Sequence, residues 1–195
     1  IDSQYNYYRS MIREWKSDDE ILVNNQPDCN YEDIFNEFTN KGFIEKMMYT
    51  DFKTYMVDDI LCKVDRAAMF HSLETRVPFL DKDVIEYAYS IPEKFKINGS
   101  NSKIILKDLI SNYLPRELIE RPKQGFGVPI SKWMQTDLNK WTKEMLSKDI
   151  NDTHGFFNQQ VVEKFLSEHL EGKKNHEHKL WSLIQFNSWY VERYK

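Results

Sequence analysis

Residues 55–81 read YMVDDILCKVDRAAMFHSLETRVPFLD, and this stretch sets the fold that we expect for the chain. Its apolar residues recur at spacings of three and four, which predicts a helix with one apolar stripe. The stripe consists of Val57, Ile60, Leu61, Val64 and Ala68. We expect this helix to be buried along the stripe and to end before Pro78, because a proline disfavours helical conformation in the residue before it. Glu74 and Arg76 would then lie where the chain leaves a buried helix.

The composition is that of a packed globular protein. The chain has 195 residues, of which 41% are hydrophobic and 14% aromatic, enough for one domain or a large part of a bigger one. A net charge of −4 argues against binding of nucleic acid through an overall basic surface. The apolar runs fall far short of the roughly 20 residues that cross a bilayer, so we expect no membrane association.

The cysteines and the start of the chain indicate a compartment. Cys29 and Cys62 form neither a disulfide framework nor a metal-ligand spacing. The histidines do not form a metal-binding pattern, since His176 and His178 lie two residues apart and do not share a helix face. We therefore expect no metal site in this chain. Because no signal-peptide pattern begins the sequence, we expect a reducing, cytoplasmic setting.

The rest of the chain predicts further helices and no sheet, so the fold class is all-α. Asp81 and Ser102 are expected to cap helices, and Pro115 to open a short helical turn. Longer helices are expected over residues 130–146 and 158–170, with Gly155 between them. The segment RPKQGFGVP at residues 121–129 contains two glycines and two prolines, which predicts a loop. Residues 77–80 are expected to be extended.

Three charged residues are candidates for chemistry. Glu74 is suited to act as a general base or to orient an amine, although an ion pair with Arg76 is the more frequent use of such a pair. Lys123 lies on the glycine-containing loop, where its ammonium group is suited to phosphate oxygens; the ordinary alternative is a solvated lysine. Lys103 follows a turn and begins a helix, where an anion would be favoured, but the spacing is not that of a Walker A loop.

Taken together, these segments resemble the synthetase domain of glutamine-hydrolysing asparagine synthetase. The resemblance begins with residues 55–81 and continues in the same order through KIILK at 103–107, LP at 114–115, the loop at 121–129 and HKLW at 178–181. It covers residues 43–194, while residues 1–42 match least and are expected to be a helical lead-in. On this basis residues 43–195 would be the helical C-terminal portion of an α/β ATP-pyrophosphatase (adenine nucleotide α-hydrolase-like) domain.

The resemblance implies an activity and roles for the candidate residues. The family adenylates the side-chain carboxylate of aspartate with ATP, and ammonia from glutamine then gives asparagine, AMP and pyrophosphate. Glu74 would lie at the acyl-adenylate, and Lys123 and Lys103 would bind ATP and pyrophosphate. Two cations at these phosphates would stabilise the charge that develops on pyrophosphate. Arg76 and Asp65 match family positions to which we assign structural roles.

Several family motifs do not occur in this sequence. They are the Ser-Gly-Gly-x-Asp-Ser pyrophosphate loop, the Gly-x-Gly-x-Asp-Glu segment whose acid helps to hold Mg²⁺, and the cysteine nucleophile of the glutaminase. We expect them upstream of Ile1, in the nucleotide-binding and glutaminase segments that would be this chain's partners, and we expect the isolated chain to be inactive. The sequence leaves open whether the protein forms a homodimer.

Two alternatives stay open alongside this interpretation. One is an amidotransferase of the same family that acts on another carboxylate, such as a sugar acid or a peptide, with a β-lactam-forming relative as a less favoured variant. The other is a non-catalytic helical interaction module, for which the many aromatic residues argue. Aromatic side chains alone do not decide, because they would also be exposed where a missing sheet should pack.

Overall fold

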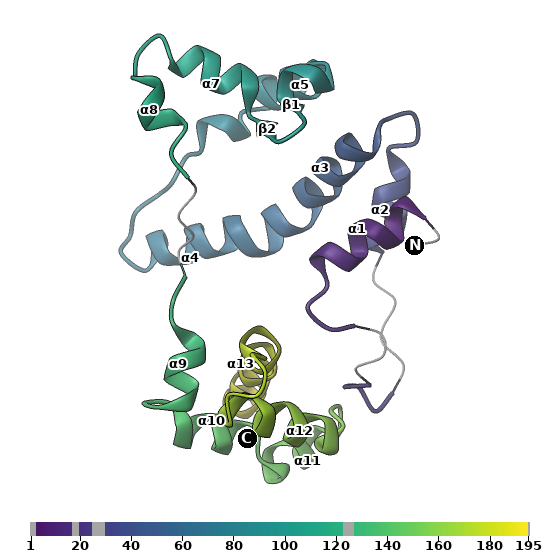
Figure 1. Ribbon diagram of the computed structural model, residues 1–195, viewed down its shortest axis with the longest axis vertical. Coiled ribbons are helices and arrows are strands. Elements are labelled where there is room, and N and C mark those ends of the chain that lie inside the picture. Colours follow the sequence, from purple (N-terminus) through teal and green to yellow (C-terminus); the bar gives the residue numbers. More distant parts are fainter. Residues whose placement is uncertain (1–2, 17–19, 25–29, 123–126, 195) are drawn as a thin grey trace. The chain divides into compact units, whose positions relative to one another are not determined.

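The expected helical fold is confirmed. The computed structural model describes residues 3–16, 20–24, 30–122 and 127–194, and nearly all regular structure in these ranges is helical (Figure 1). The chain forms two compact units. Unit 1 consists of residues 1–28 and 125–195, and unit 2 of residues 29–124. The expected division after residue 42 rested on resemblance rather than packing, and it stays a prediction.

Unit 1 combines the N-terminal helix with the C-terminal helices. They are α1 (Gln4–Ile12), α9 (Ile130–Gln135), α10 (Asn139–Met145), α11 (Lys148–His154), α12 (Gln159–Leu170) and α13 (Glu177–Tyr194). The single helix expected over residues 130–146 is therefore two helices. The break follows Thr136, whose hydroxyl donates to the Lys132 carbonyl at 2.9 Å, while the Leu138 N–H reaches back to the Trp133 carbonyl at 2.7 Å.

The core of unit 1 is aliphatic and draws on the N-terminal segment. Its most buried members are Met134, Leu146, Val162, Leu180 and Ile184. Ile21 joins this core, and its carbonyl accepts the Asn158 N–H at 2.8 Å. Trp15 lies edge-on to Phe165 at 5.5 Å between ring centroids. Described parts of the N-terminal segment are thus integral to unit 1.

A buried polar network crosses unit 1 at Asn187 of α13. The Asn187 amide donates to the Met145 carbonyl at 2.7 Å and to Asn151 Oδ1 at 2.9 Å. Its oxygen lies 3.0 Å from His154 Nε2. Because His154 Nδ1 accepts the Phe156 N–H at 3.1 Å, the Nε2 atom carries the proton and donates it to Asn187. Asn187 therefore joins α13 to both α10 and α11.

A second polar cluster joins α12 to α13. His169 is fully buried, and its Nδ1 atom accepts the His176 N–H at 3.1 Å. His176 Nε2 lies 2.6 Å from Glu168 Oε2. Burial lowers the pKa of His169, so this side chain folds in its neutral form. The hydrogen bond with His176 lowers the pKa of Glu168, so that carboxylate folds charged.

Acidification is expected to weaken unit 1 through these two groups. With its pKa depressed below 6.5, His169 binds a proton in the unfolded chain before it does so in the folded chain. Stability is therefore lost as the pH falls below 6.5, and the Glu168 contribution is lost at lower pH, below 4.5. Urea unfolding across this range should show the free energy of unfolding declining with pH.

Substitution separates the His169 contribution from general effects of acid. The variant His169→Gln should flatten the decline that begins near pH 6.5. His178→Gln is the matched control, because the His178 side chain is 71% exposed and should leave the decline as it is. If the free energy of unfolding of the His169 variant declines with pH as that of the parent does, protonation of His169 does not cause the decline.

Unit 2 contains shorter elements. They are α2 (Tyr31–Glu37), α3 (Phe43–Lys53), the π-helical η2 (Met56–Leu61), α4 (Cys62–Met69), the 3₁₀ helix η3 (Pro78–Leu80), α5 (Lys82–Ser90), α6 (Glu93–Lys96), β1 (Ile97–Asn98), β2 (Asn101–Ser102), α7 (Ile104–Ile110) and α8 (Arg116–Ile119). The strands β1 and β2 form one small antiparallel hairpin, which the sequence did not predict.

Half-buried aromatic side chains form a cluster in unit 2. Phe38 stacks on Tyr49 at 4.7 Å between centroids, and Tyr89 packs edge-on to both Phe38 and Phe52. Tyr49 donates its hydroxyl proton to Glu37 at 2.8 Å. Burial raises the pKa of Tyr89, and nearby Tyr49 adds to the effect. This cluster ties α5 to α2 and α3 and supports the long helical run that leads to Glu74.

The expected burial of the stripe on residues 57–68 is wrong for this chain. The helix forms as η2 followed directly by α4, but neither has a buried residue, and Val57 is 51% exposed. The expected inward positions Val84 and Tyr87 on α5 are also exposed. Periodicity predicts an apolar face, whereas burial needs a second surface to cover it. Among the described residues no such surface buries this face.

Local expectations at helix starts were partly confirmed. The Asp81 carboxylate accepts the N–H groups of Asp83 and Val84, which caps α5 as expected. Pro115 precedes α8 as expected. Ser102 is not a cap, because it belongs to β2, and Lys103 occupies the cap position of α7. Residues 78–80 are a 3₁₀ turn rather than extended, since Pro78 has a dihedral suited to a helix start.

Candidate functional site

Glu74 follows a sharp turn at the end of α4. The Leu73 N–H reaches back to the Ala68 carbonyl at 3.0 Å, and the Ser72 N–H to the Met69 carbonyl at 2.9 Å. These two bonds form a Schellman motif, which requires a left-handed residue just past the helix. Ser72 fills that position with φ 57°, although glycine is the usual residue there. The turn ends the helix and releases residues 73–77 in irregular conformation.

The left-handed conformation of Ser72 leads to a stability prediction. Glycine has no Cβ and adopts positive φ without strain, so Ser72→Gly should stabilise unit 2 by about 0.5–1 kcal/mol after the added entropy of the unfolded chain is subtracted. Ser111→Gly is the matched control, because Ser111 ends α7 with φ −63° and should lose stability instead. Urea unfolding measures both. Loss of stability in Ser72→Gly would contradict the strain argument.

Glu74 and Arg76 form an ion pair on this irregular segment. Side chains two residues apart on non-helical chain can point to the same side, and here the Arg76 guanidinium contacts the Glu74 carboxylate. The pair is solvated, since the side chain of Glu74 is 70% exposed and that of Arg76 is 87% exposed. Exposed pairs contribute little to stability. The ion pair predicted as an alternative is therefore present, and it leaves the carboxylate accessible to a ligand.

Lys103 lies between the hairpin and α7 and has an unusual backbone. Its φ of 59° and ψ of 36° are left-handed, and its side chain is exposed. Among the described residues, Lys103, Ser72 and Glu20 are the non-glycine residues with positive φ. Such outliers concentrate at functional sites. Lys103 is itself a candidate residue, and Ser72 lies two residues before Glu74.

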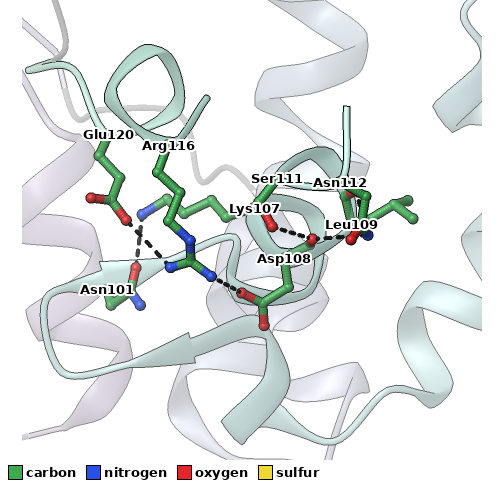
Figure 2. A network of polar contacts seen from close by, with 8 residues as sticks. All are labelled: Asn101, Lys107, Asp108, Leu109, Ser111, Asn112, Arg116 and Glu120. Atoms are coloured by element: carbon green, nitrogen blue, oxygen red, sulfur yellow. Dashed lines mark hydrogen bonds and ion pairs between the residues drawn. The ribbon is translucent and has the colours of Figure 1, made fainter. Parts of the chain in front are cut away.

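A polar network surrounds the start of α7 (Figure 2). The Lys107 ammonium donates to Asn101 Oδ1 at 2.7 Å and so connects α7 to β2. Arg116 of α8 lies 3.6 Å from the Asp108 carboxylate and 3.8 Å from that of Glu120. Figure 2 shows these contacts on one side of α7, so that the hairpin, α7 and α8 are held together by side chains. The Lys103 ammonium itself has no polar partner among the described residues.

The third candidate, Lys123, lies outside the described residues, so its role stays a prediction. Between α8 and Lys123, Arg121 Nε donates back to the Leu118 carbonyl of α8 at 3.2 Å. Residues 121–122 and 127–129 have neither helix nor strand, which agrees with the predicted loop at its described ends. Glu74 and Lys103 both belong to unit 2, but no hydrogen bond or ion pair joins them in the described ranges.

The described residues do not form a metal site. No group of three His, Cys, Asp or Glu side chains among them could hold a metal ion. A Mg²⁺ ion that accompanies ATP would need ligands from outside the described residues. In the same ranges, no helix is both long and apolar enough to span a bilayer.

Comparisons with known proteins decide the family. The family model described as asparagine synthase matches residues 2–191, nearly the whole chain and including the lead-in that resembles the family least. The chain belongs to the asparagine synthase family. Its domain is of the ATP-pyrophosphatase type, and the described part is the helical portion expected from the sequence.

Curated members of the asparagine synthase family give the extent of the match. Asparagine synthetase [glutamine-hydrolyzing] 1 of Bacillus subtilis is 32% identical over 175 residues, which cover 88% of this chain and 27% of the relative. A putative asparagine synthetase [glutamine-hydrolyzing] of Mycobacterium bovis is 30% identical, with the same coverage. The enzyme of Cricetulus griseus is 36% identical over 88 residues, or 44% of this chain and 15% of the relative. The chain thus spans about a quarter of the length of the first two relatives. No solved structure matches.

The residues that shape the backbone around the candidate residues could not be predicted from the sequence. Ser72 offered no signal, because a serine after a helix rarely adopts positive φ. Asn101 and Lys107 lie six residues apart, and their contact depends on the hairpin, which the sequence did not predict. A Gly-Ser pair between two short polar segments was the available signal for that hairpin.

Proposed function

We propose that this chain is the helical portion of an ATP-dependent amide-forming ligase that converts aspartate to asparagine. A side-chain carboxylate oxygen of aspartate attacks the α-phosphorus of ATP, the bond to the bridging oxygen breaks, and pyrophosphate leaves. Ammonia derived from glutamine then attacks the acyl carbon, loses a proton, and displaces AMP, which retains the carboxylate oxygen. The observation that carries this proposal is the family match over residues 2–191.

The proposed roles are those that the family resemblance implies, and the charge and exposure of the residues support them. Glu74 is placed on irregular chain with an accessible carboxylate, which suits contact with the acyl-adenylate and acceptance of a proton from the attacking amine. Lys103 presents an exposed ammonium, which suits ATP and pyrophosphate oxygens. Lys123 is proposed for the same phosphates, on family resemblance. Cations that are in place before pyrophosphate forms stabilise its developing charge without reorganisation.

The exposed stripe of η2 and α4 supports a larger active domain. Val57 and Val64 of this stripe are 51% and 40% exposed, and apolar patches of this kind mark surfaces that another segment covers. We propose that the nucleotide-binding sheet, with its pyrophosphate loop and magnesium-binding acid, supplies that cover. The isolated chain of 195 residues should therefore form no asparagine from ATP, aspartate and ammonia. Asparagine formed by the isolated chain would contradict this part of the proposal.

The acceptor acid is tested on the complete gene product. Pyrophosphate release is measured with ATP, ammonia and a panel of acids that contains aspartate, glutamate, a sugar acid and a carboxylate-bearing peptide. The proposal predicts release that depends on aspartate and yields equal amounts of asparagine and AMP. Release with another acid in place of aspartate would assign the chain to a different amidotransferase.

The non-catalytic alternative has an observation of its own. Phe70 and Tyr113 are 84% and 79% exposed, as the contact residues of an interaction module would be. The same assay separates the two functions. Pyrophosphate release with none of the acids, in a gene product that is folded by circular dichroism, would favour the interaction module.

A further inference from the structure

Lys103 is held in a backbone conformation that its own side chain disfavours. A residue with a Cβ atom is strained in the left-handed region, and such a residue persists there only where its surroundings enforce the conformation. The sequence offers Gly99 nearby, which takes positive φ at the tip of the hairpin without strain. The contacts around Lys103 therefore have to hold its backbone in the left-handed conformation.

The constraint comes from both sides of Lys103. On the N-terminal side, β2 is fixed by its register with β1, in which Asn98 pairs with Asn101 and Ile97 with Ser102. On the C-terminal side, the Lys107 N–H donates to the Lys103 carbonyl at 2.9 Å, which begins α7. The Lys107 side chain reaches back to β2, where its ammonium donates to Asn101 Oδ1 at 2.7 Å (Figure 2).

Lys107 thus contacts the chain on both sides of the strained residue. Its main chain bonds to Lys103 itself, and its ammonium bonds to the strand that precedes Lys103. The Lys107 ammonium donates to a neutral amide oxygen, while the Lys103 ammonium is exposed and has no polar partner in the described ranges. The two lysines at the start of α7 are therefore unequal. The Lys103 ammonium is exposed, whereas the Lys107 ammonium is hydrogen-bonded to the preceding strand.

We propose that Lys107 and Asn101 are positioning residues that keep Lys103 left-handed and direct its ammonium group to the phosphates of ATP. This inference rests on the proposed function and deepens it. Without the Lys107–Asn101 bond, the turn relaxes toward ordinary backbone angles and Lys103 spends less time aimed at the phosphates. Binding of ATP and pyrophosphate weakens, while binding of aspartate and ammonia does not change.

The test uses the complete gene product and removes the bond from either side. Lys107→Met and Asn101→Ala should each raise KM for ATP and the inhibition constant of pyrophosphate by about three- to tenfold, as expected for loss of one hydrogen bond. KM for aspartate and for ammonia should stay within about twofold, because a positioning role acts on phosphate contacts alone. The double variant should raise KM for ATP no further than the more affected single variant does, since both substitutions remove the same hydrogen bond.

Two further variants separate positioning from general damage. In Lys107→Arg, KM for ATP should stay within about twofold of the parent value, because a guanidinium can also donate to the Asn101 oxygen. Lys82→Met is the matched control: Lys82 begins α5, and its ammonium lies 3.7 Å from Glu86, so its loss should leave all kinetic constants unchanged. Hydrogen exchange over residues 101–110 should quicken in Lys107→Met and stay as in the parent elsewhere.

The outcomes distinguish the inference from the function beneath it. If Lys103→Ala raises KM for ATP but Lys107→Met and Asn101→Ala do not, the positioning inference is overturned and the proposed function stands. If every Michaelis constant shifts together in both positioning variants, the bond is merely structural and the inference is again overturned. If Lys103→Ala changes nothing, the role proposed for Lys103 fails, and the inference fails with it.

Discussion

Replacing Lys123 with alanine in the complete gene product is expected to slow adenylation of aspartate by at least about tenfold and by as much as about 10³-fold. A preplaced ammonium stabilises the negative charge that grows on pyrophosphate as its bond to the α-phosphorus breaks, so removing the ammonium raises the barrier to that step. The rate is measured as aspartate-dependent exchange of labelled pyrophosphate into ATP. Exchange within about twofold of the parent would show that Lys123 does not have this role, since one such donor contributes far more than that.

Two comparison variants sharpen this result. Lys140→Ala removes an exposed lysine of α10 that has no polar partner among the described residues, and exchange should be unaffected. Glu74→Gln keeps the shape of the side chain and removes its charge. Because Glu74 is proposed to act on the amine, this variant should retain pyrophosphate exchange and lose asparagine formation. Lys123 and Glu74 should therefore fail at different steps.

Replacing Asn187 with leucine is expected to destabilise unit 1 by about 3–5 kcal/mol. The side chain is fully buried, and its amide and carbonyl bond to Met145, Asn151 and His154 on two other helices. Leucine fills a similar volume but leaves these polar groups without partners in an environment from which water is excluded. The midpoint of urea unfolding reports the change.

A surface position on the same helix provides the control for Asn187. Gln185 is exposed on α13, so Gln185→Ala should change the free energy of unfolding by less than about 0.5 kcal/mol. A loss below about 1 kcal/mol in Asn187→Leu would mean that water or local rearrangement satisfies the partners, and that the network does not hold unit 1 together.

Local signals predicted much of the helical framework. Asp81 caps α5, Pro115 precedes α8 and Gly155 ends α11 with φ 68°, and each of these residues acts on its immediate neighbours alone. Asn187 lies among the buried residues of α13. Its partners are 33 to 42 residues away, and no local pattern indicates them.

The features that sequence did not predict depend on tertiary contact or on rare backbone angles. The stripe on residues 57–68 has the right period, but its exposure depends on which surface lies opposite. Thr136 interrupts a helix whose apolar pattern continues across it. Lys103 takes a conformation that lysine disfavours, because a hairpin and a side-chain hydrogen bond impose it. The candidate residues followed from residue type and family resemblance, whereas the turns and hydrogen bonds around them are visible only in the structure.

The central claim is that the gene product activates aspartate as an acyl-adenylate. Transfer of oxygen tests it most directly. The complete gene product is incubated with ATP, ammonia and aspartate whose side-chain carboxylate carries ¹⁸O, and the nucleotide product is analysed by mass spectrometry. Adenylation predicts that AMP gains a single labelled oxygen for each asparagine formed, because the carboxylate oxygen leaves with the phosphate. Unlabelled AMP, or label in inorganic phosphate with ADP as the nucleotide product, would contradict the account.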